Sequence, residues 1–132
     1  MFGVPGRLLT TGLGWANETL RISTHGTTHV DAPLHYAPTC DGKPARGVDE
    51  LPLEWFYAPG VVVDMTHKAH GEAITAADLQ TGLTAIGHRL AAGEILLVRT
   101  GNDRRAGSRS YFTHGPGVSA EATEWMLDQG VK

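Results

Sequence analysis

The sequence has little cysteine, no long apolar run and no signal-peptide pattern, the features that mark secreted and membrane proteins. Cys40 is the single cysteine in 132 residues, so no intrachain disulfide framework can form and a reducing cytoplasm is the expected compartment. No run approaches the roughly 20 apolar residues of a membrane-spanning helix. The start, Met1 to Arg7, lacks the pattern of a signal peptide. The sequence therefore predicts a cytoplasmic protein with no membrane partner.

Neither positive nor negative charge is in large excess. The formal net charge is -3 and the isoelectric point is about 6.1, so there is no basic footprint for nucleic acid or an anionic membrane. Arg104, Arg105 and Arg109 form one small basic cluster, which we interpret as a solvated loop. Small molecules remain as the expected partners, and the length fits one domain spanning residues 1–132.

What the sequence does have is a dense cluster of histidines. The stretch from His25 to His35 reads His-Gly-Thr-Thr-His-Val-Asp-Ala-Pro-Leu-His. In an extended chain, side chains alternate between two faces. One face would then carry the chemical groups His25, His29, Asp31 and His35, and the other the apolar Leu20, Ile22, Val30, Ala32 and Leu34. This pattern predicts a strand with one buried side and one chemical side.

A straight strand cannot bring all four chemical groups to one site. At about 3.3 Å per residue, His25 and His35 would lie roughly 33 Å apart. We therefore expect a bend at Gly26 and an end to strand pairing at Pro33. His29 and Asp31 need no bend to share an ion.

Histidine and carboxylate together suit zinc, manganese or iron(II) rather than calcium or magnesium. Three protein ligands would leave a position for water, whose pKa a metal lowers from 15.7 to about 7. A further histidine such as His35 could then move protons during attack on a carbonyl. The alternative interpretation is a hydrogen-bonded polar strand without a metal.

The middle of the chain predicts a β-α-β unit and hence an α/β fold with a partly parallel sheet. Gly60–Met65 is a short apolar run typical of a strand buried on both faces. Thr75 is an N-cap candidate for a helix over Ala76–Leu90, which Gly82 weakens. A second buried strand is expected at Ile95–Val98.

Loops should surround this unit. Residues 1–14 and 36–52 are rich in glycine and proline and are expected to be irregular. Tyr36 and Asp41 are candidate substrate contacts, whereas Cys40 is interpreted as a bystander thiol. His67 and His70 are expected on an exposed loop after a strand, although with Asp64 they could support a metal site.

The end of the sequence predicts an unfinished sheet. Ser119 should cap a helix that runs through Leu127, with Gly130 just past its end. Val131-Lys132 then looks like the start of another strand. We therefore expect either a fragment that is incomplete at its C-terminus or a sheet completed by another chain.

The run from His25 to His35 resembles the signature of the cyclase-like metal-dependent hydrolases, the family that includes bacterial kynurenine formamidase and isatin hydrolase. That signature is His-x-Gly-Thr-His-x-Asp-x-Pro-x-His, and this chain has Gly26-Thr27 in place of x-Gly. The resemblance extends through Val61–Asp64, Leu97–Gly101 and Pro116–Ser119.

The resemblance implies a role for each residue of the cluster. His25, His29 and Asp31 would bind zinc or manganese, with Asp31 able to bridge two ions, and His35 would donate and accept protons. It also implies a swivelling β/β/α domain with a mixed, partly parallel sheet flanked by helices, assembled as a homo-oligomer (dimer or tetramer). A later histidine and glutamate complete the site in the formamidases; the only late candidates here, which we do not assign, are His114, Glu121 and Glu124.

The function implied is hydrolysis of a small amide by metal-bound hydroxide. N-formylkynurenine, an aryl formamide of tryptophan catabolism, is the default substrate. Isatin or another cyclic amide or lactone is the alternative within the same class. A non-catalytic metal-binding remnant is the alternative from another class, because the second set of ligands is missing.

Overall fold

The structure is a computed structural model that describes residues 18–26 and 28–131. Contacts divide the chain into two compact units, Met1–Glu50 and Leu51–Lys132. We describe each unit by itself. The predicted loop over residues 1–14 lies outside the described residues, and the single domain over 1–132 stays a prediction.

The first unit is made of short elements. They are the helical turn α1 (Pro33–Tyr36), the strands β1 (Thr39–Cys40) and β2 (Lys43–Pro44), and the 3₁₀ turn η2 (Val48–Glu50). The two strands pair antiparallel around Asp41 and Gly42, both of which have positive φ. Asp-Gly favours this conformation in a two-residue hairpin loop. Asp41, a candidate substrate contact, is thus a turn residue in an otherwise irregular loop.

The predicted strand through the histidine cluster is wrong. No described residue before Thr39 lies in a strand, because this backbone has no neighbouring strand with which to pair. The apolar face is not buried either: Leu20 is 83% exposed, and of the predicted apolar set only Ala32 is buried. The bend at Gly26 is confirmed, since its N–H donates to Ser23 O at 3.0 Å.

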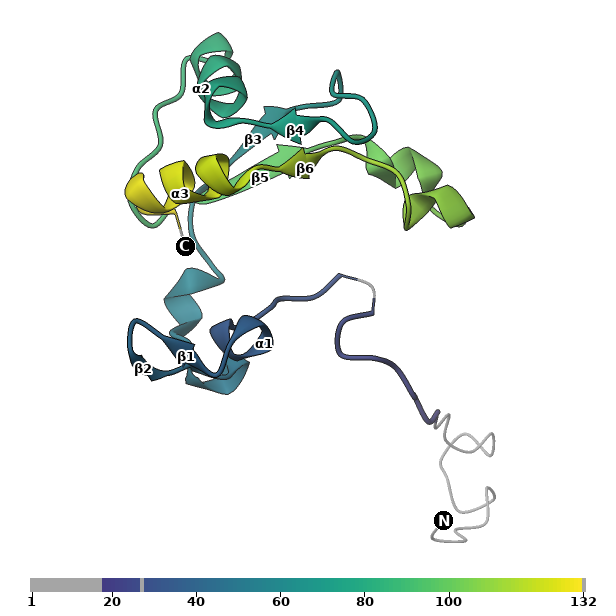
Figure 1. Cartoon of the computed structure of the whole chain (residues 1–132), viewed down its shortest axis with the longest axis vertical. Helices are drawn as coiled ribbons and strands as arrows, with labels where there is room; N and C mark the ends of the chain where they lie inside the picture. Colours follow the sequence, from purple (N-terminus) through teal and green to yellow (C-terminus); the bar gives the residue numbers. More distant parts are fainter. Residues whose placement is uncertain (1–17, 27, 132) are drawn as a thin grey trace, which may run out of the picture. The chain divides into compact units, whose positions relative to one another are not determined.

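The second unit contains the predicted β-α-β crossover (Figure 1). Strand β3 (Gly60–Asp64) leads through α2 (Ala76–Ala85) to β5 (Ile95–Arg99), and the two strands pair in parallel from Gly60–Ile95 to Asp64–Arg99. A second parallel pair joins β4 (Ala73–Ile74) to β6 (Gly117–Val118). The remaining elements are α3 (Ala120–Asp128) and the 3₁₀ turns η3 (Leu53–Trp55), η4 (Asn102–Arg105) and η5 (Arg109–Tyr111). The predicted α/β class is confirmed.

The core of the second unit lies on one side of β3 and β5. Met65, Ile74, Leu79 and Val63 are its largest fully buried side chains. The other side of the strands is open: Val62 is 51% exposed and its register partner Leu97 is 52% exposed. The prediction that both strands are buried on both faces is therefore wrong. The buried residues of α2 and α3 pack with Val61 and Val63, which lie on one face of β3, and the other face is left exposed.

Both long helices begin at side-chain caps. Thr75 and Asp78 form a capping box at α2, and Lys68 Nζ lies 2.7 Å from Asp78 Oδ2. Lys68 and the Thr75 hydrogen bonds hold the pKa of Asp78 well below its usual range. The helix ends at Ala85 rather than Leu90, since Gly87 with φ 65° follows its C-cap.

The last helix follows the prediction closely. The Ser119 hydroxyl accepts a hydrogen bond from Ala122 N, and α3 ends at Asp128 with Gly130 in the left-handed conformation. Val131 is not in a strand, and Lys132 lies outside the described residues. Among the described residues, the helices are too short to cross a bilayer.

Candidate metal centre

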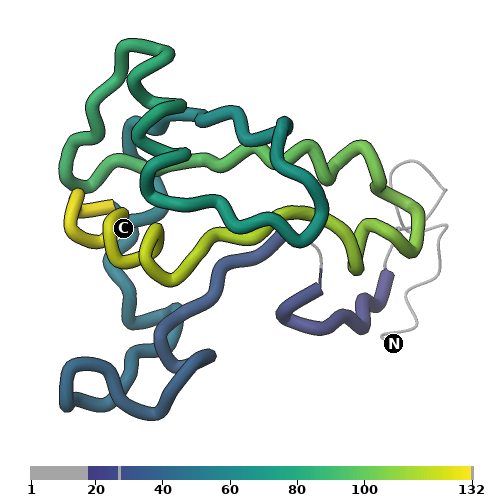
Figure 2. Tube along the Cα trace, turned by 45° about the horizontal axis from the view of Figure 1, so that its top comes forward, coloured from purple at the N-terminus to yellow at the C-terminus, as the bar shows by residue number. Residues whose placement is uncertain are grey.

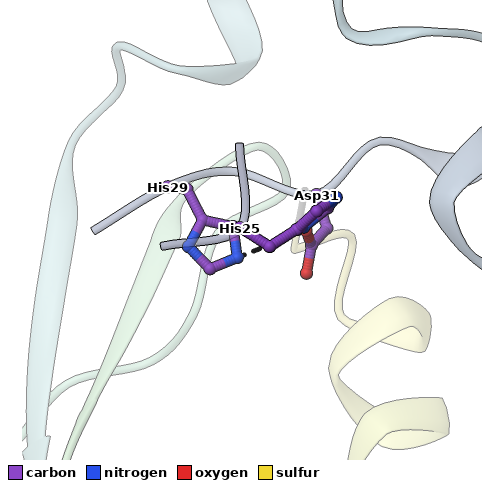
Figure 3. A group of neighbouring side chains, drawn as sticks. All are labelled: His25, His29 and Asp31. Carbon is purple, nitrogen blue, oxygen red and sulfur yellow. Dashed lines mark hydrogen bonds and ion pairs between the residues drawn. The ribbon is translucent and has the colours of Figure 1, made fainter. Parts of the chain in front are cut away.

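Three side chains of the first unit converge on one point (Figure 3). His25 Nδ1 lies 2.8 Å from Asp31 Oδ1, and His29 Nε2 lies 3.4 Å from the same oxygen. Each residue offers one ligand atom, and these atoms all lie within 4.8 Å of one another. The structure therefore brings together the three residues that the sequence predicts as metal ligands, although not on a strand.

Two local features of the chain create this geometry. The turn closed by Ser23 O and Gly26 N brings His25 back toward the segment that follows. Pro33 then begins α1 instead of ending a strand, which suits proline because the first turn of a helix needs no N–H from it. The helical turn places His35 so that its ring stacks on that of His25, with centroids 3.9 Å apart.

Asp31 is kept as a carboxylate by its neighbours. Partial burial opposes its ionisation, but hydrogen bonds from Tyr36 and His25, together with the nearby His35 and His29, outweigh this and lower the pKa of Asp31. The Tyr36 hydroxyl donates to Asp31 Oδ2 at 3.1 Å, which raises the pKa of the phenol. An ionised Asp31 is the form that binds a metal.

The donor set fits a transition metal. Two imidazole nitrogens and one carboxylate oxygen are ligands that zinc and manganese accept. The side chains are partly open to solvent, with exposed fractions of 43% for His25, 31% for His29 and 27% for Asp31. Because the hydrogen bond between His25 and Asp31 joins two of the ligand atoms, a cation would compete with the proton between them.

Tyr36 has a contact that the sequence did not indicate. It is a candidate substrate contact, which stays a prediction, and in the structure its hydroxyl donates to Asp31 from the helical turn that follows. The spacing of five residues suggests nothing by itself, because only a turn at Pro33 brings the two side chains together. Cys40 is exposed and free.

The other predicted candidates belong to the second unit. Asp64 pairs with Arg99 at 3.1 Å, and His70 stacks on His114 with ring centroids 4.5 Å apart. His67 is exposed, as the loop interpretation predicts. Within residues 18–26 and 28–131, only His25, His29 and Asp31 form a group of three or more histidines and carboxylates with metal-ligand spacing.

This chain is similar to known proteins in sequence and in fold. Residues 5–132 match the model of a family described as putative cyclase. The isatin hydrolase of Roseibium aggregatum is 29% identical over 119 residues, and the kynurenine formamidase of Salinibacter ruber is 45% identical over 51 residues. A crystal structure of an isatin hydrolase bound to the product analogue thioisatinate superposes with a TM-score of 0.63 at 27% identity.

Each match covers a larger share of this chain than of the relative. The Roseibium match covers 83% of this chain and 45% of the relative, the Salinibacter match 39% and 22%, and the crystal structure match 76% and 41%. The chain thus spans less than half the length of the relatives it matches. Because the family model matches nearly the whole chain, the chain belongs to the putative cyclase family.

Proposed function

We propose that this protein is a metal-dependent hydrolase of a small amide. The observation that carries the proposal is the convergence of His25, His29 and Asp31 within 4.8 Å in a chain of the putative cyclase family. His25, His29 and Asp31 would hold zinc or manganese. When bound, such an ion lowers the pKa of water toward 7 and polarises a carbonyl oxygen.

His35 is the residue to which we assign proton transfer. Amide hydrolysis breaks the bond between the carbonyl carbon and nitrogen, adds water across it, and requires a proton on the departing nitrogen. His35 is exposed and stacked on His25, so it stands beside the proposed ligands without being one of them. An imidazole carries two ring nitrogens and can both accept and donate that proton.

Two substrates are supported by different comparisons. Kynurenine formamidase gives the higher identity but over 39% of this chain, which supports an aryl formamide such as N-formylkynurenine. Isatin hydrolase matches 83% of the chain in sequence and 76% in structure, which supports a cyclic amide. The cytoplasmic location and a dimer or tetramer stay predictions.

Metal binding is tested first, by calorimetric titration of the purified chain with Zn²⁺ and, separately, Mn²⁺. We expect stoichiometric binding that is lost in His29→Ala and Asp31→Asn. The matched control is His67→Ala, which removes an exposed histidine of the second unit and should leave the stoichiometry unchanged. Equal binding by all three variants would contradict the assignment.

Activity is tested with a panel of aryl formamides, lactams and lactones, with and without the metal. Faster hydrolysis of formamides would favour an aryl formamide as the substrate, and faster hydrolysis of lactams would favour a cyclic amide. His35→Ala should reduce the rate while retaining the metal. Full activity after metal removal would disprove the proposed mechanism, and metal binding without hydrolysis of any panel member would favour a non-catalytic metal-binding protein.

A further inference from the structure

A cavity of about 440 Å³ opens at one end of the parallel pair in the second unit. Its walls come from the two loops that follow β3 and β5, including Thr66 and Thr100, and from Gly115 and Pro116 before β6. Figures 1 and 2 show these loops at the same end of the strands. In open α/β sheets, ligands bind at the carboxyl ends of the parallel strands.

The charge of the cavity has one sign. Lys68, His70, Arg104 and Arg105 contribute to its lining, and no aspartate or glutamate does. Lys68 is already paired with Asp78. In contrast, neither Arg104 nor Arg105 forms an ion pair with a carboxylate of the described residues. Within the part of the chain that the structure describes, these two arginines beside the cavity therefore have no carboxylate partner.

The loops are tied together without a ligand. Gly71 N donates to Gly115 O at 3.0 Å, and Gly115 N donates to His70 Nδ1 at 3.3 Å. Asn102 Nδ2 donates to Tyr111 O at 2.9 Å, which links the turn that carries the arginines to the turn that follows it. A pre-formed cavity loses little entropy on binding.

One further polar group suits an anion. Thr100 Oγ1 accepts a hydrogen bond from Asn102 N at 3.4 Å, so its hydroxyl proton is free to donate elsewhere. The side chain of Thr66, by contrast, already hydrogen-bonds to the Asp64 carboxylate. Sites for small organic ligands begin at about 300 Å³. The cavity is therefore larger than an inorganic ion requires.

We infer that this cavity binds a small organic oxyanion, a carboxylate or phosphate on a compact body, through Arg104 and Arg105. The inference does not rest on the proposed hydrolase function, because every lining residue belongs to the second unit. Of the basic cluster Arg104, Arg105 and Arg109, the first two line the cavity and Arg109 does not.

The test uses four probes with the 132-residue chain: benzoate, phenyl phosphate, inorganic phosphate and the neutral benzamide. Amide chemical shifts and calorimetry report the site and the affinity. We expect benzoate or phenyl phosphate to shift amides in residues 66–70 and 100–105, with benzamide causing no such shift. The tighter of the two anions identifies the head group.

Variants then test the arginines. The double variant Arg104→Gln/Arg105→Gln should weaken binding by about tenfold or more, as expected for lost charge-assisted hydrogen bonds. Arg109→Gln removes one positive charge from the neighbouring turn η5, and each single variant, Arg104→Gln or Arg105→Gln, is its matched comparison; Arg109→Gln should change the affinity by less than about twofold. Circular dichroism checks that the variants fold. The chemical-shift changes are measured with the unmodified chain, so that part of the test stands even if a variant does not fold.

Four results would overturn the inference. They are equal binding of benzamide and benzoate, binding of inorganic phosphate alone, an equal loss in Arg109→Gln, and the absence of shifts in residues 66–70 and 100–105 with every probe.

Discussion

Tyr36 supports the candidate metal centre from outside the ligand set. Its hydroxyl donates to Asp31 Oδ2 at 3.1 Å, while Asp31 Oδ1 faces His25 and His29. The two oxygens of one carboxylate thus have separate tasks, one toward the candidate ion and one toward the phenol. Such outer hydrogen bonds orient metal ligands and commonly change metal affinity by ten- to hundredfold.

We predict that Tyr36→Phe weakens Zn²⁺ binding by about tenfold without changing its stoichiometry. The phenyl ring is retained, so packing against His35, with ring centroids 5.0 Å apart, should persist. Competition with a chromogenic chelator measures the affinity. Tyr57→Phe is the matched control because Tyr57 is 93% exposed, and an equal loss in that variant would disprove the role of Tyr36.

At the residue scale, the sequence predicted the chemical types but not how they meet. Two imidazoles and a carboxylate within seven residues suggested a metal site, and the structure brings these three side chains together; their role as ligands stays a prediction. The support from Tyr36 was not predictable, because it depends on Pro33 beginning a helical turn. Alternation of apolar residues from Leu20 to Leu34 favoured a strand, but a strand requires a partner that the described chain does not supply.

At the scale of elements, Gly82 explains how α2 lies on β3. Glycine in a helix interior costs about 1 kcal/mol relative to alanine, and for that reason it lowered the expectation of a helix. In the structure, a Cβ at position 82 would overlap Val63 Cγ1 and lie 3.0 Å from Met65 Cε. Both neighbours are only 1% exposed, so neither can move aside into solvent.

We therefore predict that Gly82→Ala lowers the free energy of unfolding by about 1–3 kcal/mol, the usual cost of overpacking a core. Helix propensity alone predicts that Gly82→Ala raises the free energy of unfolding. Urea denaturation measures that free energy and distinguishes the two predictions. Thr81→Ala, on the exposed side of the same helix, should be neutral or slightly stabilising, and a gain in stability for Gly82→Ala would contradict the packing argument.

The boundaries of elements were predicted best where a side chain caps a helix. Thr75 and Ser119 begin α2 and α3 as expected, because a hydroxyl that accepts a backbone N–H is a local signal. The end of α2 was placed five residues late, at Leu90. Apolar spacing continued past Ala85, whereas the left-handed Gly87 ended the helix.

At the scale of the whole molecule, buried apolar side chains are divided unevenly between the two units. Among the described residues of the first unit, the buried apolar set contains only Ala32 and Ala45. The large buried side chains all belong to the second unit. The sequence predicted the second unit well because it reads as a local β-α-β pattern, and the first unit poorly because few apolar contacts determine it.

This difference predicts how the chain responds to metal. Regions with few buried contacts open at low free energy, so amides in residues 28–46 should exchange with solvent faster than those of β3 and α2. An ion held by His25, His29 and Asp31 binds only the closed form, and at a hundred times its dissociation constant it stabilises that form about hundredfold. Exchange in residues 28–46 should slow by up to this factor, with β3 and α2 unchanged.

Hydrogen exchange with mass spectrometry, in chelator and in excess Zn²⁺, measures this effect segment by segment. In Asp31→Asn the slowing should disappear, because that change removes the negative charge of a proposed metal ligand in the first unit. Slowing of β3 and α2 alone would place the ion in the second unit. Equal slowing of every segment would mean that the first unit opens only when the second unit unfolds, despite its few buried side chains.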